Sequence, residues 1–416
     1  MVATGTFACA SSGNASSACR GVPSTTTASP PICNVDGILA SGPRCPVDST
    51  LARVLNRMSW GAQEREEPLR RAYELCERVA DPGKILPALF QVTQFNITRM
   101  RLSEARELAS RALALAPSSG DPVLKAGAPY NAGESSFWYG DLRNSHAHLE
   151  RAFALIEKIS PNALIRAYGV DCWFLGAMLR AVTELLFRRL TRAIDLETRI
   201  FERATSSPWL TTKSLGLCSV HVQHKSEASG IKSSNVSNRL ARFVTNSAFL
   251  RARAWQNSLV GWASFWRGER ARGLQEMSEA VVQLRELGTL IMSTWRLVLL
   301  AEAQIELESY GAAGDTVADA SANLERTNEG WCEAEVYRVA GELKRRKASG
   351  DIAVAEQQYR KAIDVARNQG AKWWELRAVK SLARVLRDTN RRDEGTRDPR
   401  RNLRLVHGRL RHRRPQ

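Results

Sequence analysis

The sequence lacks any charge-free run of about 18 apolar residues, the length that a helix needs to cross a bilayer. Its most apolar stretch, Val170 to Phe187, contains Asp171, Arg180 and Glu184, which is typical of helices buried in a protein core. No Lys or Arg precedes an apolar segment at the N-terminus, so the pattern of a secretory signal is missing as well. We therefore expect a cytoplasmic protein that does not enter a membrane.

Closely spaced cysteine pairs are also absent. Disulfide frameworks and zinc sites need tighter, paired spacing than this chain offers. Cys218, His221 and His224 form a C-x2-H-x2-H cluster that lacks a clear fourth ligand. We expect reduced thiols and no bound metal. The eight cysteines are Cys9, Cys19, Cys33, Cys45, Cys76, Cys172, Cys218 and Cys332.

Motifs of nucleotide chemistry are missing too. A phosphate-binding loop needs the pattern G-x-x-x-x-G-K-[ST], whose backbone amides hold the phosphates, and this pattern does not occur. Cyclase chemistry needs paired carboxylates in a mixed α/β domain, which the sequence does not predict. We therefore expect no enzyme activity and no cofactor.

Strand-like alternation is scarce, and helical texture dominates residues 51–390. Ala, Leu, Arg and Glu are frequent there, and breakers such as Gly140-Asp141 and Ser160-Pro161 recur along the chain. Residues 1–50 are rich in Ser, Thr, Ala, Gly and Pro, so we expect disorder there. The stretch Thr205 to Asn246 is poor helix material, which predicts a loop or a damaged repeat.

A recurring triplet indicates internal repeats. Its members are a small residue, then usually an apolar residue, then Ala, at offsets that place all three on one helix face. Successive triplets begin 40, 128, 40 and 42 residues apart, so two further units are hidden in the long gap. The sequence predicts an all-α, tetratricopeptide-like superhelix of antiparallel helix pairs, whose first helices form a concave face. The triplets are Ala105, Ala109 and Ala112; Ser145, Leu149 and Ala152; Gly273, Met277 and Ala280; Ala313, Val317 and Ala320; and Ala355, Tyr359 and Ala362.

Two stretches near the C-terminus carry a resemblance to a known family. Cys332 to Leu343 and Ala355 to Arg367, continued by Gln369 to Ala378 and Ser381 to Arg384, resemble the C-terminal helical repeats of bacterial multidomain adenylate/guanylate cyclase-like proteins. In that family a cyclase or DNA-binding domain precedes an AAA-type signalling ATPase, and the repeats follow. The resemblance implies a regulatory or interaction region, and possession of an upstream ATPase or cyclase module is an expectation that comes from it. No catalytic residue of those domains is matched here.

The net charge of +17 has a local source in the segment 391–416, which holds ten arginines against three acidic residues. One permitted codon choice for Arg401 to Pro415, read one base out of frame, encodes EIYGWFTEGFDTAD, which resembles the usual ending of this family. We interpret this Arg-rich tail as a disordered, frameshifted segment. Nucleic-acid binding through the tail is the alternative.

The tryptophans are the main candidate for a binding surface. Trp255, Trp262 and Trp266 share one helix face, and Trp373 and Trp374 adjoin a turn. They predict an aromatic groove for a protein or peptide, and the alternative is that the rings fill the space between stacked helices. His146 and His148 alternate on a helix and are expected on its surface. The sequence favours a non-catalytic interaction scaffold, with a fragment of a cyclase-like ATPase as a further alternative.

Overall fold

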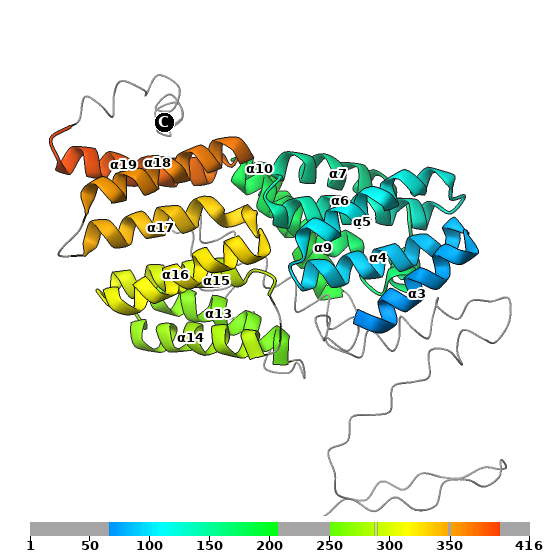
Figure 1. The fold of residues 1–416 in the computed structure, drawn as a ribbon, viewed down its shortest axis with the longest axis horizontal. Coiled ribbons are helices and arrows are strands. Elements are labelled where there is room, and N and C mark those ends of the chain that lie inside the picture. The colour runs from blue at the N-terminus through cyan, green and yellow to red at the C-terminus, as the bar shows by residue number, and fades with distance from the viewer. Residues whose placement is uncertain (1–65, 207–249, 287, 289, 348–350, 392–416) are drawn as a thin grey trace, which may run out of the picture.

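The chain folds as an all-α helical-repeat protein. The computed structural model describes residues 66–206, 250–286, 288, 290–347 and 351–391 (Figure 1). These residues form fifteen α-helices and no strand. The helices are α3 (Glu66–Val79), α4 (Pro82–Thr98), α5 (Leu102–Leu115), α6 (Pro122–Tyr139), α7 (Leu142–Ile156), α8 (Pro161–Tyr168), α9 (Cys172–Leu186), α10 (Leu190–Ser206), α13 (Leu250–Trp266), α14 (Arg270–Glu286), α15 (Ser293–Glu306), α16 (Tyr310–Thr327), α17 (Glu333–Arg346), α18 (Ile352–Gln369) and α19 (Lys372–Asp388).

Most helices pack as antiparallel pairs joined by short turns. The pairs are α4 with α5, α6 with α7, α9 with α10, α13 with α14, α15 with α16, and α17 with α18. The first helices of neighbouring pairs also contact one another: α4 contacts α6, and α15 contacts α17. This is the tetratricopeptide-like arrangement that the triplet spacing predicts.

The triplet residues lie on the second helix of five pairs, namely α5, α7, α14, α16 and α18. All are buried except Val317, which is half-buried. Their partners on the first helix are often glycines. A methyl group added to Gly133 would lie 2.6 Å from Leu149 Cγ, and one added to Gly341 would lie 2.8 Å from a ring carbon of Tyr359. The middle residue of the triplet thus fills the space that a glycine leaves open.

One of the two hidden repeats lies in the described residues, as the pair α9–α10. Ala193 and Ile200 are buried on α10 at the outer triplet positions, but Glu197 stands where the triplet has an apolar residue. That acidic residue hides the repeat from a search for apolar middle residues. Residues 207–249, which include Cys218, His221 and His224, lie outside the described part, as do residues 1–65 and 392–416 with the Arg-rich tail.

The turns inside five of the six pairs share one backbone geometry. In these five, the first helix ends at a residue in the left-handed region, and the N–H of the following residue donates to the carbonyl five residues back, as Arg189 N–H does to Glu184 O at 2.8 Å. This is the Schellman ending, for which glycine is the usual residue. The five left-handed residues are Met100, Gly140, Arg188, Gly268 and Glu308.

Most of the helix-breaking residues predicted from the sequence lie where a helix begins or ends. Asp81, Asp121 and Asp141 cap α4, α6 and α7 by accepting hydrogen bonds from backbone N–H groups of the first turn. Gly311, by contrast, does not separate two helices, since it lies inside α16 just after the turn residue Glu308. Helices α4, α6 and α9 are buried almost all round.

A short helix that breaks the pairing, α8, covers α4 and α6. The Tyr168 ring stacks on Phe90 with centroids 4.1 Å apart, and its hydroxyl donates to the carbonyls of Val123 and Leu124. Gln91 Nε2 donates in turn to the Tyr168 carbonyl at 2.7 Å. This part of the first-helix face is therefore filled by the chain itself.

The described helices form two halves that meet side by side (Figure 1). We call α3 to α10 the N-terminal half and α13 to α19 the C-terminal half. They touch where α9 contacts α19 and where α6 contacts the 3-10 turn Gly330–Cys332. Among the described helices, none is both long enough and apolar enough to span a bilayer.

Candidate functional site

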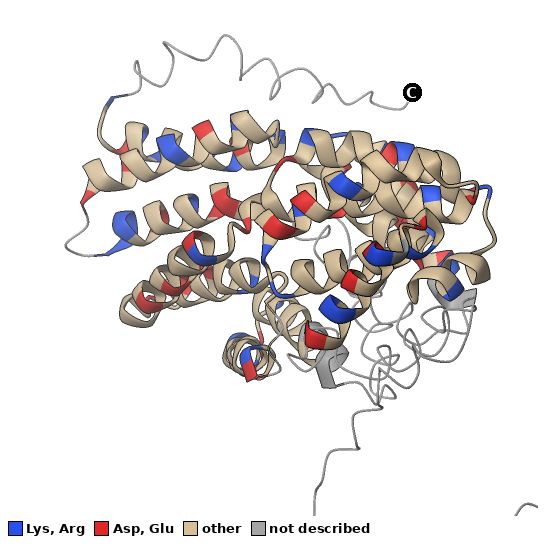
Figure 2. Ribbon diagram, turned by 45° about the vertical axis from the view of Figure 1, so that its right-hand side comes forward, with Lys and Arg blue, Asp and Glu red and all other residues tan. Residues whose placement is uncertain are grey.

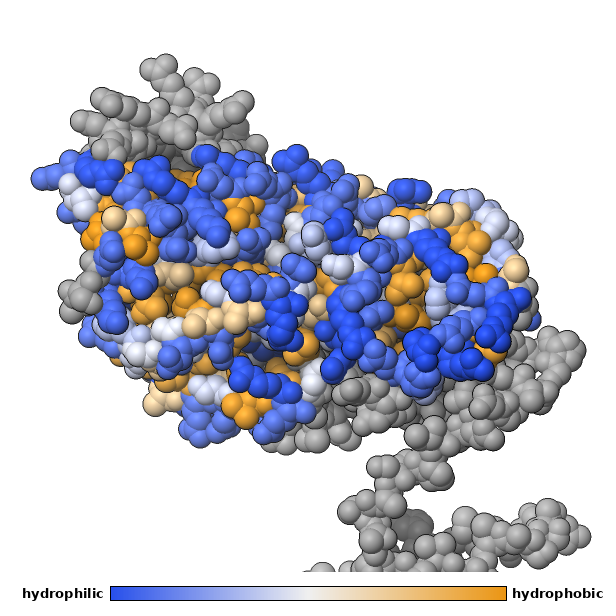
Figure 3. Space-filling view, viewed as in Figure 1, coloured by the Kyte–Doolittle hydropathy of each residue, from blue (hydrophilic) through white to orange (hydrophobic). Residues whose placement is uncertain are grey.

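Four of the five tryptophans selected from the sequence have described side chains, and these four differ in their exposure. Trp262 and Trp374 are buried, at 8% and 5% exposure, because they pack between stacked helices. Trp266 is 48% exposed and Trp373 is half-buried, while Trp255 lies in α13 with a side chain outside the described set. On the face shown in Figure 3, apolar residues form separate patches surrounded by polar ones. Among the candidate tryptophans with described side chains, Trp266 and Trp373 are therefore the two that solvent reaches.

Buried Trp374 belongs instead to an aromatic cluster at the contact between the halves. Trp331 stacks on Phe137 of the N-terminal half with centroids 5.5 Å apart, and it lies 5.4 Å from Trp295 of α15. Trp374 lies 5.4 Å from Trp295 and donates from Nε1 to the Trp331 carbonyl. Trp138 meets Trp331 edge-on at 6.2 Å. Local spacing does not reveal this cluster, because its members come from segments that are far apart along the chain.

A buried carboxylate fixes Trp331 in place. Glu329 is fully buried and accepts hydrogen bonds from Trp331 Nε1 and from the backbone N–H of Thr294, both at 3.1 Å. Burial raises the pKa of Glu329, although these hydrogen bonds and nearby Arg296 act in the opposite direction. The carboxyl group therefore ties the start of α15 to the aromatic cluster.

Four charged residues form a network across the first helices of the C-terminal half. Arg338 of α17 binds Glu335 at 2.9 Å and also binds Glu302 of α15. Arg377 of α19 binds Glu302 at 2.8 Å and Glu335 at 2.5 Å. Burial disfavours the Arg338 charge, but the two carboxylates outweigh it and raise the pKa of that guanidinium. The network links three helices and has balanced charge.

His146 and His148 are not surface residues, contrary to expectation. The His146 side chain is 18% exposed because it faces α9, where its Nε2 lies 2.9 Å from Glu184 Oε1. His148 is half-buried, and burial lowers its pKa, as does the charge of Arg151. Helix α9 packs against α7 in the folded chain. The expectation of surface histidines considered α7 alone and left out this neighbouring helix.

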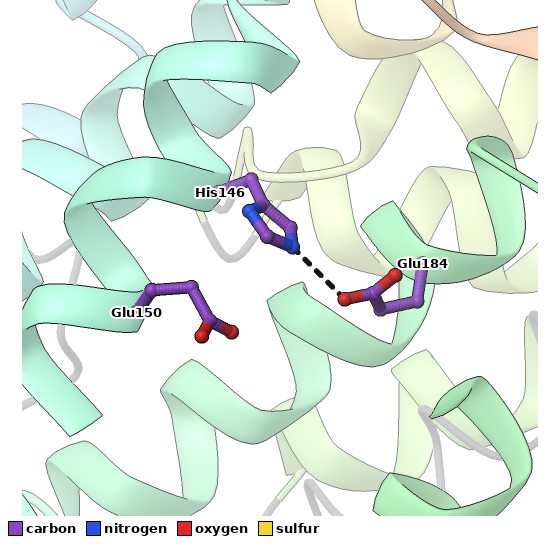
Figure 4. A group of neighbouring side chains, drawn as sticks. All are labelled: His146, Glu150 and Glu184. Carbon is purple, nitrogen blue, oxygen red and sulfur yellow. Dashed lines mark hydrogen bonds and ion pairs between the residues drawn. The ribbon is translucent and has the colours of Figure 1, made fainter. Parts of the chain in front are cut away.

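His146, Glu150 and Glu184 have the composition of a metal site, and Figure 4 shows them facing one another from α7 and α9. Their ligand atoms lie within 4.8 Å of one another. Guanidinium groups already occupy the carboxylates, however. Arg180 binds Glu150, and Arg189 lies 3.4 Å from Glu184.

These arginines would repel a bound cation. Arg192 adds a further positive charge 3.8 Å from Glu184. Burial would raise the pKa of Glu184, but the hydrogen bond from His146 and the charges of Arg189 and Arg192 lower it. We interpret the group as an ion-pair network that joins α7, α9 and the start of α10.

Charge is otherwise dispersed over the described helices. Basic and acidic residues are interspersed along them in Figure 2. In the described part no dense basic stripe follows a single helix, so the helices themselves do not present the basic face that is typical of duplex binding.

Comparisons with known proteins identify the fold. No family model matches the chain, and no curated protein matches it either. Among solved structures, a Rap protein complexed with Competence and Sporulation Factor superposes with a TM-score of 0.61 at 10% identity, over 86% of this chain and 96% of that one. The apo form of the quorum sensor NprR from B. thuringiensis superposes with a TM-score of 0.50 at 13% identity, over 85% and 97%. Both are tetratricopeptide-like helical-repeat structures, so the likeness shows that fold.

Proposed function

We propose that this chain is a non-catalytic scaffold that binds a protein or peptide partner. Trp266 carries the proposal. It is 48% exposed at the end of α13, and it lies edge-on to buried Phe265 at 5.3 Å. A large aromatic residue held by buried neighbours on a rigid helix is the kind of residue that dominates binding energy.

The architecture supports this proposal. Neighbouring helix pairs contact mainly each other, which leaves an extended outer surface on which several repeats can act together. The Rap structure is a complex with Competence and Sporulation Factor, so a scaffold of similar shape accommodates a partner. Half-buried Trp373, on α19, is the second contact residue that we propose.

Selection from a random peptide library on the immobilised full-length chain tests the proposal. We expect selected peptides to bind in isothermal titration calorimetry, and Trp266→Ala to weaken that binding about tenfold or more. The matched control is Val282→Ala, which removes a 55% exposed apolar side chain from α14. Failure to select any binding peptide would overturn the proposal, and equal effects of both variants would remove Trp266 from it.

As a second candidate, we propose that the chain is the repeat region of a larger cyclase-like signalling protein. The stretches that carry the resemblance lie mainly in three consecutive helices that contact one another, α17, α18 and α19. Sequencing the genomic locus on both sides of the coding region tests this idea. An upstream ATPase frame, with a one-base slip that restores EIYGWFTEGFDTAD, is the expected result, and unrelated upstream DNA with an intact frame would contradict it.

A further inference from the structure

Six cationic side chains gather where the two halves meet, and we call them the cationic seam. Two observations join the N-terminal half to the turn between α18 and α19. The Arg188 guanidinium lies 5.9 Å from the Trp373 ring centroid, and a methyl group added to Gly370 would lie 3.0 Å from Arg143 Nε. Figure 1 shows the start of α10 beside this turn. The seam consists of Arg143, Arg188, Arg189, Arg192, Arg367 and Lys372.

The carboxylates beside the seam are buried, whereas the cations reach the surface. Glu184 is 1% exposed in its side chain, while Arg189 and Arg192 around it are 46% and 67% exposed. Glu375 is 6% exposed, and the Arg367 and Lys372 side chains that bind it are 40% and 47% exposed. Positive charge therefore faces outward, over negative charge that solvent does not reach.

Both buried carboxylates beside the seam are held by seam cations. Arg367 Nε meets Glu375 at 2.8 Å, and Lys372 Nζ meets it at 2.7 Å, so one carboxylate is held by two cations. Among the described residues, neither Arg143 nor Arg188 forms an ion pair with a carboxylate. Guanidinium groups of this kind suit the planar, two-oxygen geometry of a further carboxylate.

We propose that the cationic seam is the docking site for a carboxylate-rich peptide segment of a protein partner. Five of its six cations are arginines, and a single half-buried indole, Trp373, lies among them. Surfaces that bind single-stranded nucleic acid usually add several aromatic side chains for base stacking, so the composition favours a peptide over a single strand. A segment bound here would contact both halves at once. The inference rests on the proposed function, because it names the partner class of such a scaffold.

Fluorescence anisotropy with a labelled poly-glutamate peptide tests the seam in the full chain. The ten arginines of residues 391–416 would also attract a poly-anionic peptide, so the comparison is between variants of equal charge. Arg189→Glu with Arg192→Glu reverses two seam cations. Arg272→Glu with Arg285→Glu reverses two cations on α14 that are 66% and 67% exposed. We expect about tenfold weaker binding for the seam variant and about twofold or less for the control.

A second variant separates binding from folding. Arg189 and Arg192 also stabilise Glu184, so their reversal could unfold the chain, whereas Arg143→Gln with Arg188→Gln removes no ion pair to a carboxylate of the described residues. This variant should keep the wild-type circular dichroism spectrum and still lose several-fold in affinity. The inference is overturned if the seam and α14 variants lose the same affinity for poly-glutamate. It is also overturned if a poly-glutamine peptide binds the wild type as tightly as poly-glutamate does.

The remaining outcomes are also decisive. If a single-stranded DNA oligonucleotide binds more tightly than poly-glutamate and loses more affinity in the seam variant, the seam is a nucleic-acid site and the inference is wrong. If library-selected peptides bind through Trp266 while the seam variant binds poly-glutamate as tightly as the wild type, the seam inference fails and the proposed scaffold function stands. If neither peptide class binds, both fail.

Discussion

Gly140 and Gly330 touch across the contact between the two halves. A methyl group added to Gly140 would lie 2.8 Å from the carbonyl carbon of Gly330, and one added to Gly330 would lie 2.3 Å from the Tyr139 carbonyl oxygen. Gln369 Nε2 donates to the Gly330 carbonyl at 2.7 Å in the same place. The halves therefore meet backbone to backbone, beside the aromatic cluster around Trp331.

Gly330→Ala should separate the halves without straining the backbone, since Gly330 does not have a positive φ. Overpacking of this kind costs about 1–3 kcal/mol, so we expect a clear fall in Tm by circular dichroism. The control is Gly120→Ala, because nothing lies within 4 Å of a methyl group added there. Equal Tm values for the two variants would show that the contact is loose.

Glu308→Gly should stabilise the chain. Glu308 has a φ of 58° in the turn between α15 and α16, a conformation that costs an L-residue about 1 kcal/mol of steric strain that glycine does not have. We expect chemical denaturation to show a gain of about 0.5–1 kcal/mol. Glu325→Gly, in an exposed position within α16, should instead lower the free energy of unfolding by about 1 kcal/mol. A lower free energy of unfolding for Glu308→Gly than for the wild type would contradict the left-handed geometry of the turn.

Arg338→Ala should be among the most damaging single changes in the C-terminal half. It leaves Glu335, which is fully buried, and Glu302 with one guanidinium fewer. Breaking a buried ion pair in this way costs about 3–5 kcal/mol. Arg360→Ala removes an exposed pair with Glu356 and should cost less than about 1 kcal/mol. Urea denaturation of both variants measures the difference, and similar losses would refute the role of burial.

Glu134→Gln should change how stability depends on pH. Burial raises the pKa of Glu134 above 4.5, although hydrogen bonds from Gln94 and Trp138 lower it in part. Well below the ordinary Glu pKa of about 4.3 the carboxyl group is protonated in both states, so it adds no pH dependence there. Above that value the unfolded chain releases its proton first, and the folded chain loses relative stability.

Glutamine cannot ionise, so the Tm of Glu134→Gln minus that of the wild type should rise between about pH 4 and about pH 7. Thermal unfolding at several pH values measures this difference. Glu325→Gln, an exposed carboxyl on α16, is the control and should show a much smaller trend. A flat difference for Glu134→Gln would mean that its carboxyl group is not destabilised by burial.

Local periodicity was enough to predict the helix pairs, because the triplet residues make contacts within one pair. Ser145, Leu149 and Ala152 meet the neighbouring helix whatever the rest of the array does. The pair α9–α10 escaped the pattern, since Glu197 occupies its middle position. Helix α8 escaped it as well, because Tyr168 packs on α4 and α6 and has no counterpart in the repeat.

The contacts between the halves were not predictable in the same way. Phe137 and Trp331 stack only because the fold brings α6 against the 3-10 turn before α17, a contact between segments far apart in the sequence. Helical spacing identified a shared face for Trp262 and Trp266, but it could not say that one ring is buried and the other half-exposed. That outcome depends on which helix lies opposite each ring.

The Schellman turns have a consequence for how such a protein changes over time. Their hydrogen bonds join backbone groups, and Met100, Arg188 and Glu308 hold the same position that Gly140 and Gly268 hold elsewhere. Bends that rely on the main chain tolerate many side chains, at a cost of about 1 kcal/mol where glycine is lost. Substitutions at these bends leave the architecture intact, so the same fold is compatible with a sequence identity as low as 10%.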